Sequence, residues 1–391
     1  MNTLGIEALV AYMKGLIQNL KGKPLFDTYF EKIEACTPIE IIDAIDRLIL
    51  EKADMEALKL AISKTLNVLH NNLSQLERPK IPKESMLYYL VENNKIMDRK
   101  LKELRSDIKT LNNYEENLDL RKSILAKIQD ISRFEKHYII KENILFPLIE
   151  KELPNYRCLQ VMWSIEDDIR KTWKQLTDLL NSGDFEISTF NEYVGNLYFD
   201  MYAIKFREEK ILFPVILERI APSKFEGLLE EAMELGFPYI QPDLKIESST
   251  VSTLTQELVN LPTGNLNLKE LELIFNTLPV DLTFVDADDT VRFFSSPEKR
   301  IFPRSKAIIG RKVQNCHPPE SIDIVNKILE AFKKGEKTKA EFWIQLKGQF
   351  VLIQYYALFD ENKKYTGTLE VSMEITDIKK LEGEKRLLDW E

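Results

Sequence analysis

The chain has 391 residues and a formal net charge of −9, with 44% hydrophobic and 30% charged residues. This composition is typical of a globular protein of two or three domains, and the acidic balance argues against nucleic-acid binding, which depends on neutralising phosphates. No apolar run reaches the roughly 18 residues of a membrane helix, no export signal opens the chain, and three widely separated cysteines fit a reducing compartment. We therefore expect a cytoplasmic protein that binds neither nucleic acid nor a membrane.

Residues 1–78 show helical periodicity and predict a small all-helical domain. Thr37, Pro38 and Glu40 predict a helix start, because threonine caps, proline suits the first turn and glutamate can bond back to the cap. Asp54 is expected to cap the next helix. Two prolines within residues 77–85 interrupt the pattern and predict a domain boundary there.

Four long helical patterns follow, at roughly 85–111, 115–151, 156–182 and 186–220. Their short connections predict an up-down four-helix bundle, to which we assign residues 84–240. Two of its segments echo each other, KENILFPLIEK at 141–151 and EEKILFPVILER at 208–219. Each contains a proline, Pro147 or Pro214, which removes a backbone donor, so matching kinks are expected.

The bundle is rich in carboxylates and poor in histidine. A di-iron site needs several imidazoles and carboxylates that project inward from all four helices. Only one of the three histidines, His137, lies in the bundle, and the residue four positions later is Lys141 rather than a carboxylate. The alternatives are a metal-free scaffold and a carboxylate-rich site for iron or manganese, whose candidate ligands are His137, Glu142, Glu166 and Glu208.

Residues 1–245 resemble the helical half of a family that joins an uncharacterised N-terminal domain to a hemerythrin-like bundle. The matching stretches are VENN at 91–94, KHYIIKENILFPLIEK at 136–151, VMWSIEDDIRK at 161–171 and FREEKILFPVILERI at 206–220. The resemblance implies a di-iron site, but Glu166 stands where the family has a histidine, and Glu84 replaces another. Residues 63–66 stand in place of a Cys-Asp-x-His stretch of the family. These departures oppose oxygen-binding di-iron chemistry.

Residues 241–265 include a polar, Ser/Thr-rich stretch and predict a linker. Residues 266–391 then show two short strand patterns around an Asp-rich turn, helical pieces, and three further strand patterns. This order predicts an α+β domain with a five-stranded antiparallel sheet covered by helices. The chain as a whole is therefore expected to be multidomain, with an all-α part followed by an α+β domain.

The C-terminal region resembles the PAS family. The matching stretches are LPVDLTFVDADDTVRFFS at 278–295, IIGRKVQNCHPPES at 308–321, AEFWIQ at 340–345 and LEVSMEITDIKKLEGEKRLLDW at 369–390. The resemblance implies a ligand sensor in which the sheet and its helices enclose a small apolar pocket, suited to a small organic ligand or haem. The last residues of the fourth stretch, 385–390, lie outside the described residues.

Two prolines hold the loop that carries Cys316 and His317 extended ahead of a helix. A His beside a Cys can ligate haem iron or form a redox-sensitive pair, and the alternative is a structural histidine in a rigid turn. Arginines near the pocket rim can receive an anionic ligand or form salt bridges with nearby aspartates. The candidate ligand-binding residues are Cys316, His317, Arg311, Phe294, Trp343 and Tyr355.

These patterns favour a non-enzymatic sensor or regulatory adaptor. In this hypothesis a small ligand or redox cue occupies the C-terminal pocket, and helical contacts relay its presence. The expected partners are the small-molecule ligand and either a second copy of the chain or a separate signalling protein. The alternative function is that of a di-metal protein that handles oxygen, peroxide or nitric oxide in the bundle.

Overall fold

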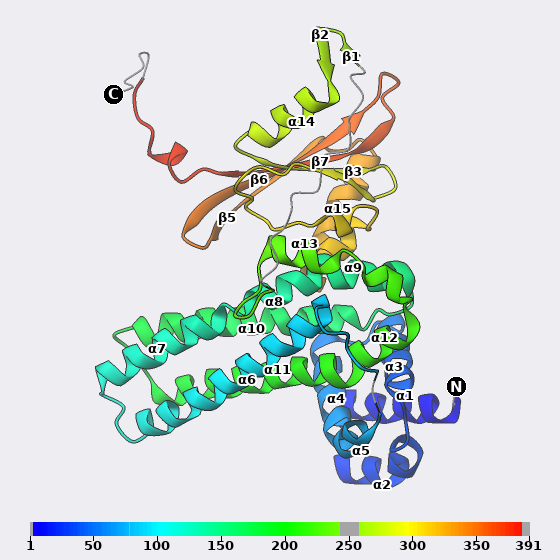
Figure 1. Ribbon diagram of the computed structural model, residues 1–391, viewed down its shortest axis with the longest axis vertical. Coiled ribbons are helices and arrows are strands. Elements are labelled where there is room, and N and C mark those ends of the chain that lie inside the picture. The colour runs from blue at the N-terminus through cyan, green and yellow to red at the C-terminus, as the bar shows by residue number, and fades with distance from the viewer. Residues whose placement is uncertain (1–2, 78, 243–257, 385–391) are drawn as a thin grey trace. The chain divides into compact units, whose positions relative to one another are not determined.

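The computed structural model describes residues 3–77, 79–242 and 258–384, and the chain divides into two compact units, residues 1–245 and 246–391 (Figure 1). The predicted order, an all-α part followed by an α+β part with a five-stranded antiparallel sheet, is confirmed. None of the helices in the described ranges is both long and apolar enough to cross a lipid bilayer.

Five helices open the first unit: α1 (Thr3–Ile17), α2 (Gly22–Ile33), α3 (Pro38–Leu50), α4 (Met55–Val68) and α5 (His70–Gln75). Both predicted caps are present. Before α3, the Thr37 hydroxyl accepts from the Glu40 N–H while the Glu40 carboxylate accepts from the Thr37 N–H at 2.9 Å. Before α4, Asp54 accepts from the Ala57 N–H at 2.9 Å. These contacts satisfy backbone donors that the helix itself leaves unpaired.

The bundle consists of four helical runs whose neighbours pack in an antiparallel ring, as predicted. The second and fourth runs each contain a short π-helical segment, η1 or η2. The runs are α6 (Met86–Leu111); α7 (Leu118–Ser132), α8 (Glu135–Ile140), η1 (Lys141–Leu145) and α9 (Phe146–Glu152); α10 (Leu159–Asn181); and α11 (Ile187–Arg207), η2 (Glu208–Leu212) and α12 (Phe213–Arg219). The turn η3 (Pro222–Phe225) and the helix α13 (Leu228–Leu235) follow the bundle.

The predicted proline kinks take the form of π-helical turns. η1 and η2 directly precede α9 and α12, in whose first turns Pro147 and Pro214 lie. A π-helical turn accommodates one extra residue, and a proline in the first turn of the following helix lacks a donor that this position does not need. The two echoing segments therefore share a backbone irregularity as well as a sequence, and both irregularities lie beside the buried polar centre of the bundle.

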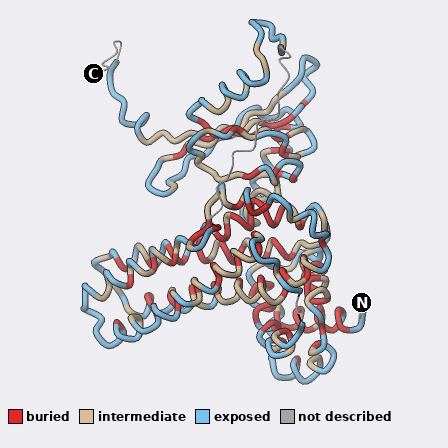
Figure 2. Tube along the Cα trace, in the orientation of Figure 1, coloured by how far each residue is buried: buried red, intermediate tan, exposed pale blue. Residues whose placement is uncertain are grey.

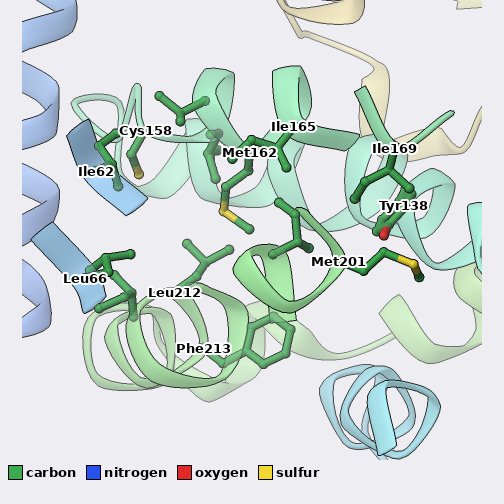
Figure 3. Close-up of a cluster of buried hydrophobic side chains, with 14 of the residues drawn as sticks. Ile62, Leu66, Tyr138, Cys158, Met162, Ile165, Ile169, Met201, Leu212 and Phe213 are labelled. Carbon is green, nitrogen blue, oxygen red and sulfur yellow. The ribbon is translucent and has the colours of Figure 1, made fainter. Parts of the chain in front are cut away.

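The hydrophobic core of the first unit runs from the N-terminal helices into the bundle (Figure 2). Figure 3 shows Ile62 and Leu66 of α4 in the same cluster as Met162 of α10 and Leu212 of η2. The helices before and after residue 78 thus share one hydrophobic core. The domain boundary predicted near this residue stays a prediction.

The second unit contains a small hairpin, two helices and the five-stranded sheet. Its elements are β1 (Leu258–Leu261), β2 (Gly264–Asn267), α14 (Leu268–Thr277), β3 (Asp281–Asp286), β4 (Val291–Phe294), η4 (Lys306–Ile308), η5 (Val313–Cys316), η6 (Pro319–Ser321), α15 (Ile322–Lys333), β5 (Lys339–Leu346), β6 (Gln349–Phe359), β7 (Tyr365–Glu374) and η7 (Ile378–Lys380). The strand order is β4-β3-β7-β6-β5, and every neighbouring pair is antiparallel. α15 packs against β7.

Part of the predicted linker is a strand. Residues 258–261 form β1, which pairs antiparallel with β2 from Leu258 opposite Asn267 to Leu261 opposite Gly264. The predicted linker over 241–265 therefore includes a short strand that the sequence pattern did not indicate, and the linker itself stays a prediction. Residues 243–257 of the predicted linker lie outside the described residues.

Candidate functional site

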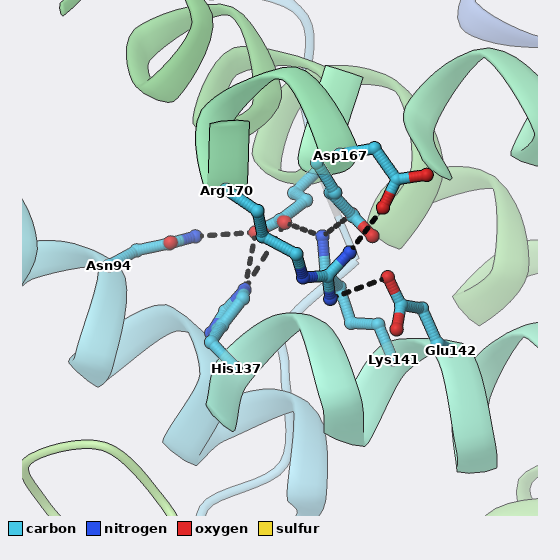
Figure 4. A network of polar contacts seen from close by, with 8 residues as sticks. Asn94, His137, Lys141, Glu142, Asp167 and Arg170 are labelled. Carbon is cyan, nitrogen blue, oxygen red and sulfur yellow. Dashed lines mark hydrogen bonds and ion pairs between the residues drawn. The ribbon is translucent and has the colours of Figure 1, made fainter. Parts of the chain in front are cut away.

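A buried polar cluster lies at the centre of the bundle (Figure 4). It brings together His137 of α8, Lys141 of η1, Glu166 of α10 and Glu208 of η2, and all four side chains are fully enclosed. Three of the four predicted metal-ligating residues therefore meet at one place. The fourth member of the cluster is a lysine.

Lys141 connects the two carboxylates. Its ammonium group donates to Glu166 Oε1 and to Glu208 Oε1. On the other side of Glu208, His137 Nε2 lies 3.0 Å from Oε2, and the amide of Asn94, on α6, donates to the same oxygen at 2.8 Å. Since an ionised carboxylate only accepts, Nε2 carries the imidazole proton. Three donors from two helical runs thus converge on Glu208.

The environment sets a different ionisation state for each carboxyl group. Burial on its own raises the pKa of Glu208, but Lys141 and His137 outweigh it and lower this pKa to about 2. Burial raises the pKa of Glu166 well above its usual value, although Lys141 opposes the shift. Burial also lowers the pKa of His137 against the attraction of Glu208. These shifts place the negative charge of the cluster on Glu208, opposite the ammonium of Lys141, and favour the protonated form of Glu166 and the neutral imidazole of His137.

The low pKa of Glu208 predicts a loss of stability in acid. The folded-state pKa is about 2 against an ordinary value of 4.5, so the stabilisation is complete above 4.5 and is lost as the pH falls towards 2. Urea unfolding between these pH values is expected to show a shallower acid dependence for Glu208→Gln than for the wild-type protein. Glu103→Gln, on an exposed part of α6, is the matched control and is expected to keep the wild-type slope. Equal slopes in all three proteins would contradict this assignment.

Glu142 does not join the cluster. Its carboxylate accepts from Arg170 of α10 at 2.8 Å, and Arg170 also donates to Asp167 at 2.8 Å (Figure 4). The prediction of Glu142 as a ligand beside His137 is not supported, because neighbouring residues of η1 point in different directions, so that Lys141 faces the cluster and Glu142 faces Arg170. Lys141, Asn94 and Arg170 were not among the predicted site residues. The only signal for Lys141 was its position four residues after His137.

The residues of this cluster do not fit a di-iron centre. The ammonium of Lys141 lies between the two carboxylates that would have to bridge or bind the metal ions, and it already balances the charge of Glu208. Within the described ranges, no group of three or more His, Cys, Asp or Glu residues is arranged to hold a metal ion. His137 Nδ1 and Glu166 Oε2 are buried without a hydrogen-bond partner in that part of the chain.

The second unit contains a cavity of about 240 Å³ between α15 and the sheet. Nine apolar and five polar side chains line it. They are Val285, Val313, Ile324, Val325, Ile328, Leu329, Phe342, Ile344 and Ile353, together with His317, Ser321, Tyr355, Thr368 and Glu370. The cavity therefore has an apolar interior with a few hydrogen-bonding groups, as in small-ligand sites.

Two of the predicted ligand-binding residues, His317 and Tyr355, line this cavity. Cys316 and Phe294 pack instead against the small hydrophobic core of the unit. Arg311 is buried, and its side chain is not part of the cavity lining. The loop predicted to be functional thus contributes its histidine to the cavity, while its cysteine packs against the core.

Trp343 faces away from the cavity, contrary to the prediction. Its side chain is 63% exposed, and its strand neighbours Phe342 and Ile344 line the cavity in its place. Successive side chains of a strand point to opposite faces of the sheet, so one face of β5 holds positions 342 and 344 and the other holds 343. Because β5 is apolar on both faces, its sequence did not reveal which face is internal.

The two polar side chains predicted for the cavity are uncharged at neutral pH. Burial lowers the pKa of His317, and the nearby Arg304 and Arg311 lower it further, to about 4 in total. Burial, reinforced by Glu370, raises the pKa of Tyr355. A neutral imidazole and a phenol offer both hydrogen-bond donors and acceptors to a ligand.

The two units match two family models. Residues 86–216 match the hemerythrin HHE cation binding domain, and residues 271–376 match the PAS domain. A comparison with curated proteins gave no match. Among solved structures, the chain is similar to a C-terminal domain from Streptococcus mutans, with 30% identity, a TM-score of 0.31 and coverage of 32% of this chain and 98% of that one.

Two further solved structures are similar at lower identity. A sensory box sensor histidine kinase from Vibrio cholerae shares 14% identity over 27% of this chain and 89% of that one, with a TM-score of 0.22. A PAS domain from Colwellia psychrerythraea shares 17% identity over 28% of this chain and 98% of that one, also with a TM-score of 0.22. The chain thus carries a hemerythrin HHE cation binding domain followed by a PAS domain, an order consistent with multidomain proteins that join the two.

Proposed function

We propose that this protein is a non-enzymatic sensor or regulatory adaptor in which a small ligand occupies the PAS cavity and alters the contacts of α15. The combination of a sensory PAS domain with a hemerythrin domain supports a sensor or regulator in general. The cavity between α15 and the sheet is the observation that carries the more specific proposal.

The size and lining of the cavity favour a small, largely apolar ligand. Its volume of about 240 Å³ lies below the roughly 300–1,000 Å³ of most drug-sized ligand sites, which favours a small organic molecule over a macrocycle such as haem. Phe342 and Ile344 supply apolar walls that remain 39% and 38% exposed. His317 and Tyr355 would orient a ligand that carries one or two hydrogen-bonding groups.

The relay in this proposal begins at α15, which forms one wall of the cavity. A ligand shifts a conformational equilibrium only through its different affinity for two states, and here the states would differ in how α15 packs on the sheet. The recipient of the signal would be a second copy of the chain or a separate signalling protein. The alternative function, di-metal chemistry in the bundle, is disfavoured by the position of Lys141 between Glu166 and Glu208.

A cavity-filling variant tests the proposal on the full chain. Val325→Phe puts a larger side chain into the cavity, and Lys327→Phe adds the same side chain to an exposed position of α15 as the control. A panel of small apolar compounds with one polar group is screened by thermal unfolding. A ligand at 100 times its Kd is expected to stabilise the wild-type protein and the control by about 2.7 kcal/mol.

The expected result is that Val325→Phe loses this stabilisation while it remains folded by circular dichroism. Hydrogen exchange in α15 should slow when the compound is added to the wild-type protein. If no compound changes the unfolding temperature, or if Val325→Phe responds like the control, the PAS cavity is not the sensing site.

A further inference from the structure

Arg207, the last residue of α11, is a buried cation without an acidic partner. This residue is only 5% exposed, and its guanidinium donates to the Ser63 hydroxyl of α4 at 2.9 Å. In the described part of the chain its Nε has no hydrogen-bond partner, and no carboxylate forms an ion pair with it. The other buried lysine and arginine residues in the described part of this unit, Lys59 and Lys141, are both paired with carboxylates.

An uncompensated buried charge is costly, and proteins rarely keep one without a purpose. Burial lowers the pKa of Arg207 to about 10, against the opposing influence of Asp200, so the guanidinium stays charged at neutral pH. The hydrogen-bond partner of its guanidinium is the Ser63 hydroxyl, which carries no charge. Asp200 acts on this charge without a direct ion pair, so an external anion would supply the direct charged contact that Arg207 lacks.

Arg207 lines a cavity of about 590 Å³ where α4 and α5 pack against α11, entirely within the first unit. This volume lies within the range of small-molecule sites. Four of the lining side chains are basic and one is acidic, namely Arg105, Lys205, Arg207, Lys210 and Glu209. The ammonium of Lys205 lies 3.6 Å from the Asp98 carboxylate. Burial raises the pKa of Glu209, and Lys205 and Lys210 oppose this shift. Arg207 is the most deeply buried of these basic side chains, and these interactions do not include it.

Flat side chains form one wall of the same cavity. Phe206 stacks on His70 with ring centroids 5.1 Å apart, and Phe199 of α11 lines the cavity while 48% exposed. Tyr198 adds a third ring from the same helix, and its hydroxyl is already bonded to the Leu101 carbonyl. An exposed aromatic surface beside a buried cation suits a ligand with an anionic group and a flat or apolar body.

We propose that this cavity binds a small organic anion, whose phosphate or carboxylate group pairs with Arg207 and whose ring packs against Phe199 and Phe206. A guanidinium presents parallel N–H donors that match both kinds of oxyanion. This site lies in the first unit and is separate from the PAS cavity, so its occupancy does not depend on the proposed sensing function.

Five probes separate the anionic from the aromatic contribution. Inorganic phosphate and acetate supply the charge alone, phenyl phosphate and benzoate supply the charge with a ring, and benzyl alcohol supplies the ring alone. Calorimetric titration of the full chain is expected to show binding of phenyl phosphate or benzoate at least about tenfold tighter than of the matching simple anion and of benzyl alcohol. Comparison of phenyl phosphate with benzoate, and of phosphate with acetate, identifies whether the site favours a phosphate or a carboxylate group.

Arg207→Met is expected to weaken binding of the best probe by about 100-fold or more, because it removes the charged hydrogen bonds. Arg99→Met, at an exposed position of α6, is the matched control and should bind as the wild-type protein does. Without a probe, Arg207→Met should unfold at a temperature no lower than that of the wild-type protein, because a buried unpaired charge has been removed. Ser63→Ala, which removes the hydroxyl that orients Arg207, is expected to weaken binding less and keeps the test available if Arg207→Met does not fold.

Failure of all five probes to bind the wild-type protein at millimolar concentration would overturn the proposal. Equal binding by the wild-type protein and a folded Arg207→Met variant would overturn it as well. These outcomes leave the PAS proposal untouched, since that proposal is tested by variants of α15.

Discussion

Replacing Lys141 by methionine is expected to destabilise the first unit by about 3–5 kcal/mol, the cost of removing one partner from a buried ion pair. Methionine has a similar volume, so the loss is electrostatic rather than a loss of packing. Without the ammonium, the carboxylate of Glu208 keeps the donors His137 and Asn94 but has no compensating charge, and Glu166 loses its hydrogen bond. Denaturant unfolding followed by hydrogen exchange in α10 and α11 reports this unit separately from the other.

Lys102→Met is the control for Lys141→Met. Lys102 forms an exposed pair with Asp98 on α6, and its loss is expected to cost less than about 1 kcal/mol. Adding Glu208→Gln to Lys141→Met should recover part of the lost stability, since both charges are then absent. A cost for Lys141→Met as small as that of the control would show that Lys141 does not hold the cluster together.

The two carboxyl groups of the cluster are expected to respond differently to the same substitution. Glu208→Gln should cost about 2–4 kcal/mol, because a charged acceptor of three donors is replaced by an amide with one acceptor oxygen. Glu166→Gln should cost less than about 1 kcal/mol, because burial raises the pKa of Glu166 and glutamine mimics the protonated acid. The two variants are matched in size and chemistry, so each controls for the other.

The comparison is made by urea unfolding of the full chain at neutral pH, again with exchange in α10 and α11 as the readout. The predicted ranking follows from the lowered pKa of Glu208 and the raised pKa of Glu166. Equal costs for the two variants would indicate a proton shared between them, and the reverse ranking would place the negative charge on Glu166.

The fold could be predicted from the sequence because helix signals and apolar periodicity are local. Thr37 with Glu40 marked a helix start that the structure contains, and the strand patterns of the C-terminal region gave all five strands of the sheet. The short hairpin at 258–267 was missed because four-residue strands bury too few side chains to produce a clear pattern.

The candidate site was only partly predictable, because its charges are arranged by tertiary contacts. The position of Lys141 after His137 was visible in the sequence, but its contacts with Glu166 and Glu208 depend on two other helical runs. Regular helical spacing could not anticipate the π-helical turns that separate the directions of neighbouring residues. Arg207 lies in a run of charged residues that is typical of an exposed helix face, and tertiary packing, including its contact with Ser63 of α4, buries it.

The cation at the centre of this bundle is the ammonium group of Lys141, which is part of the chain and is present as soon as the chain folds. A chelator cannot withdraw an ammonium group that is covalently attached, a competing ion cannot exchange with it, and it has no second oxidation state. Folding of the first unit is therefore expected to proceed without iron, and the unit should keep its shape in iron-starved and in well-aerated cells alike.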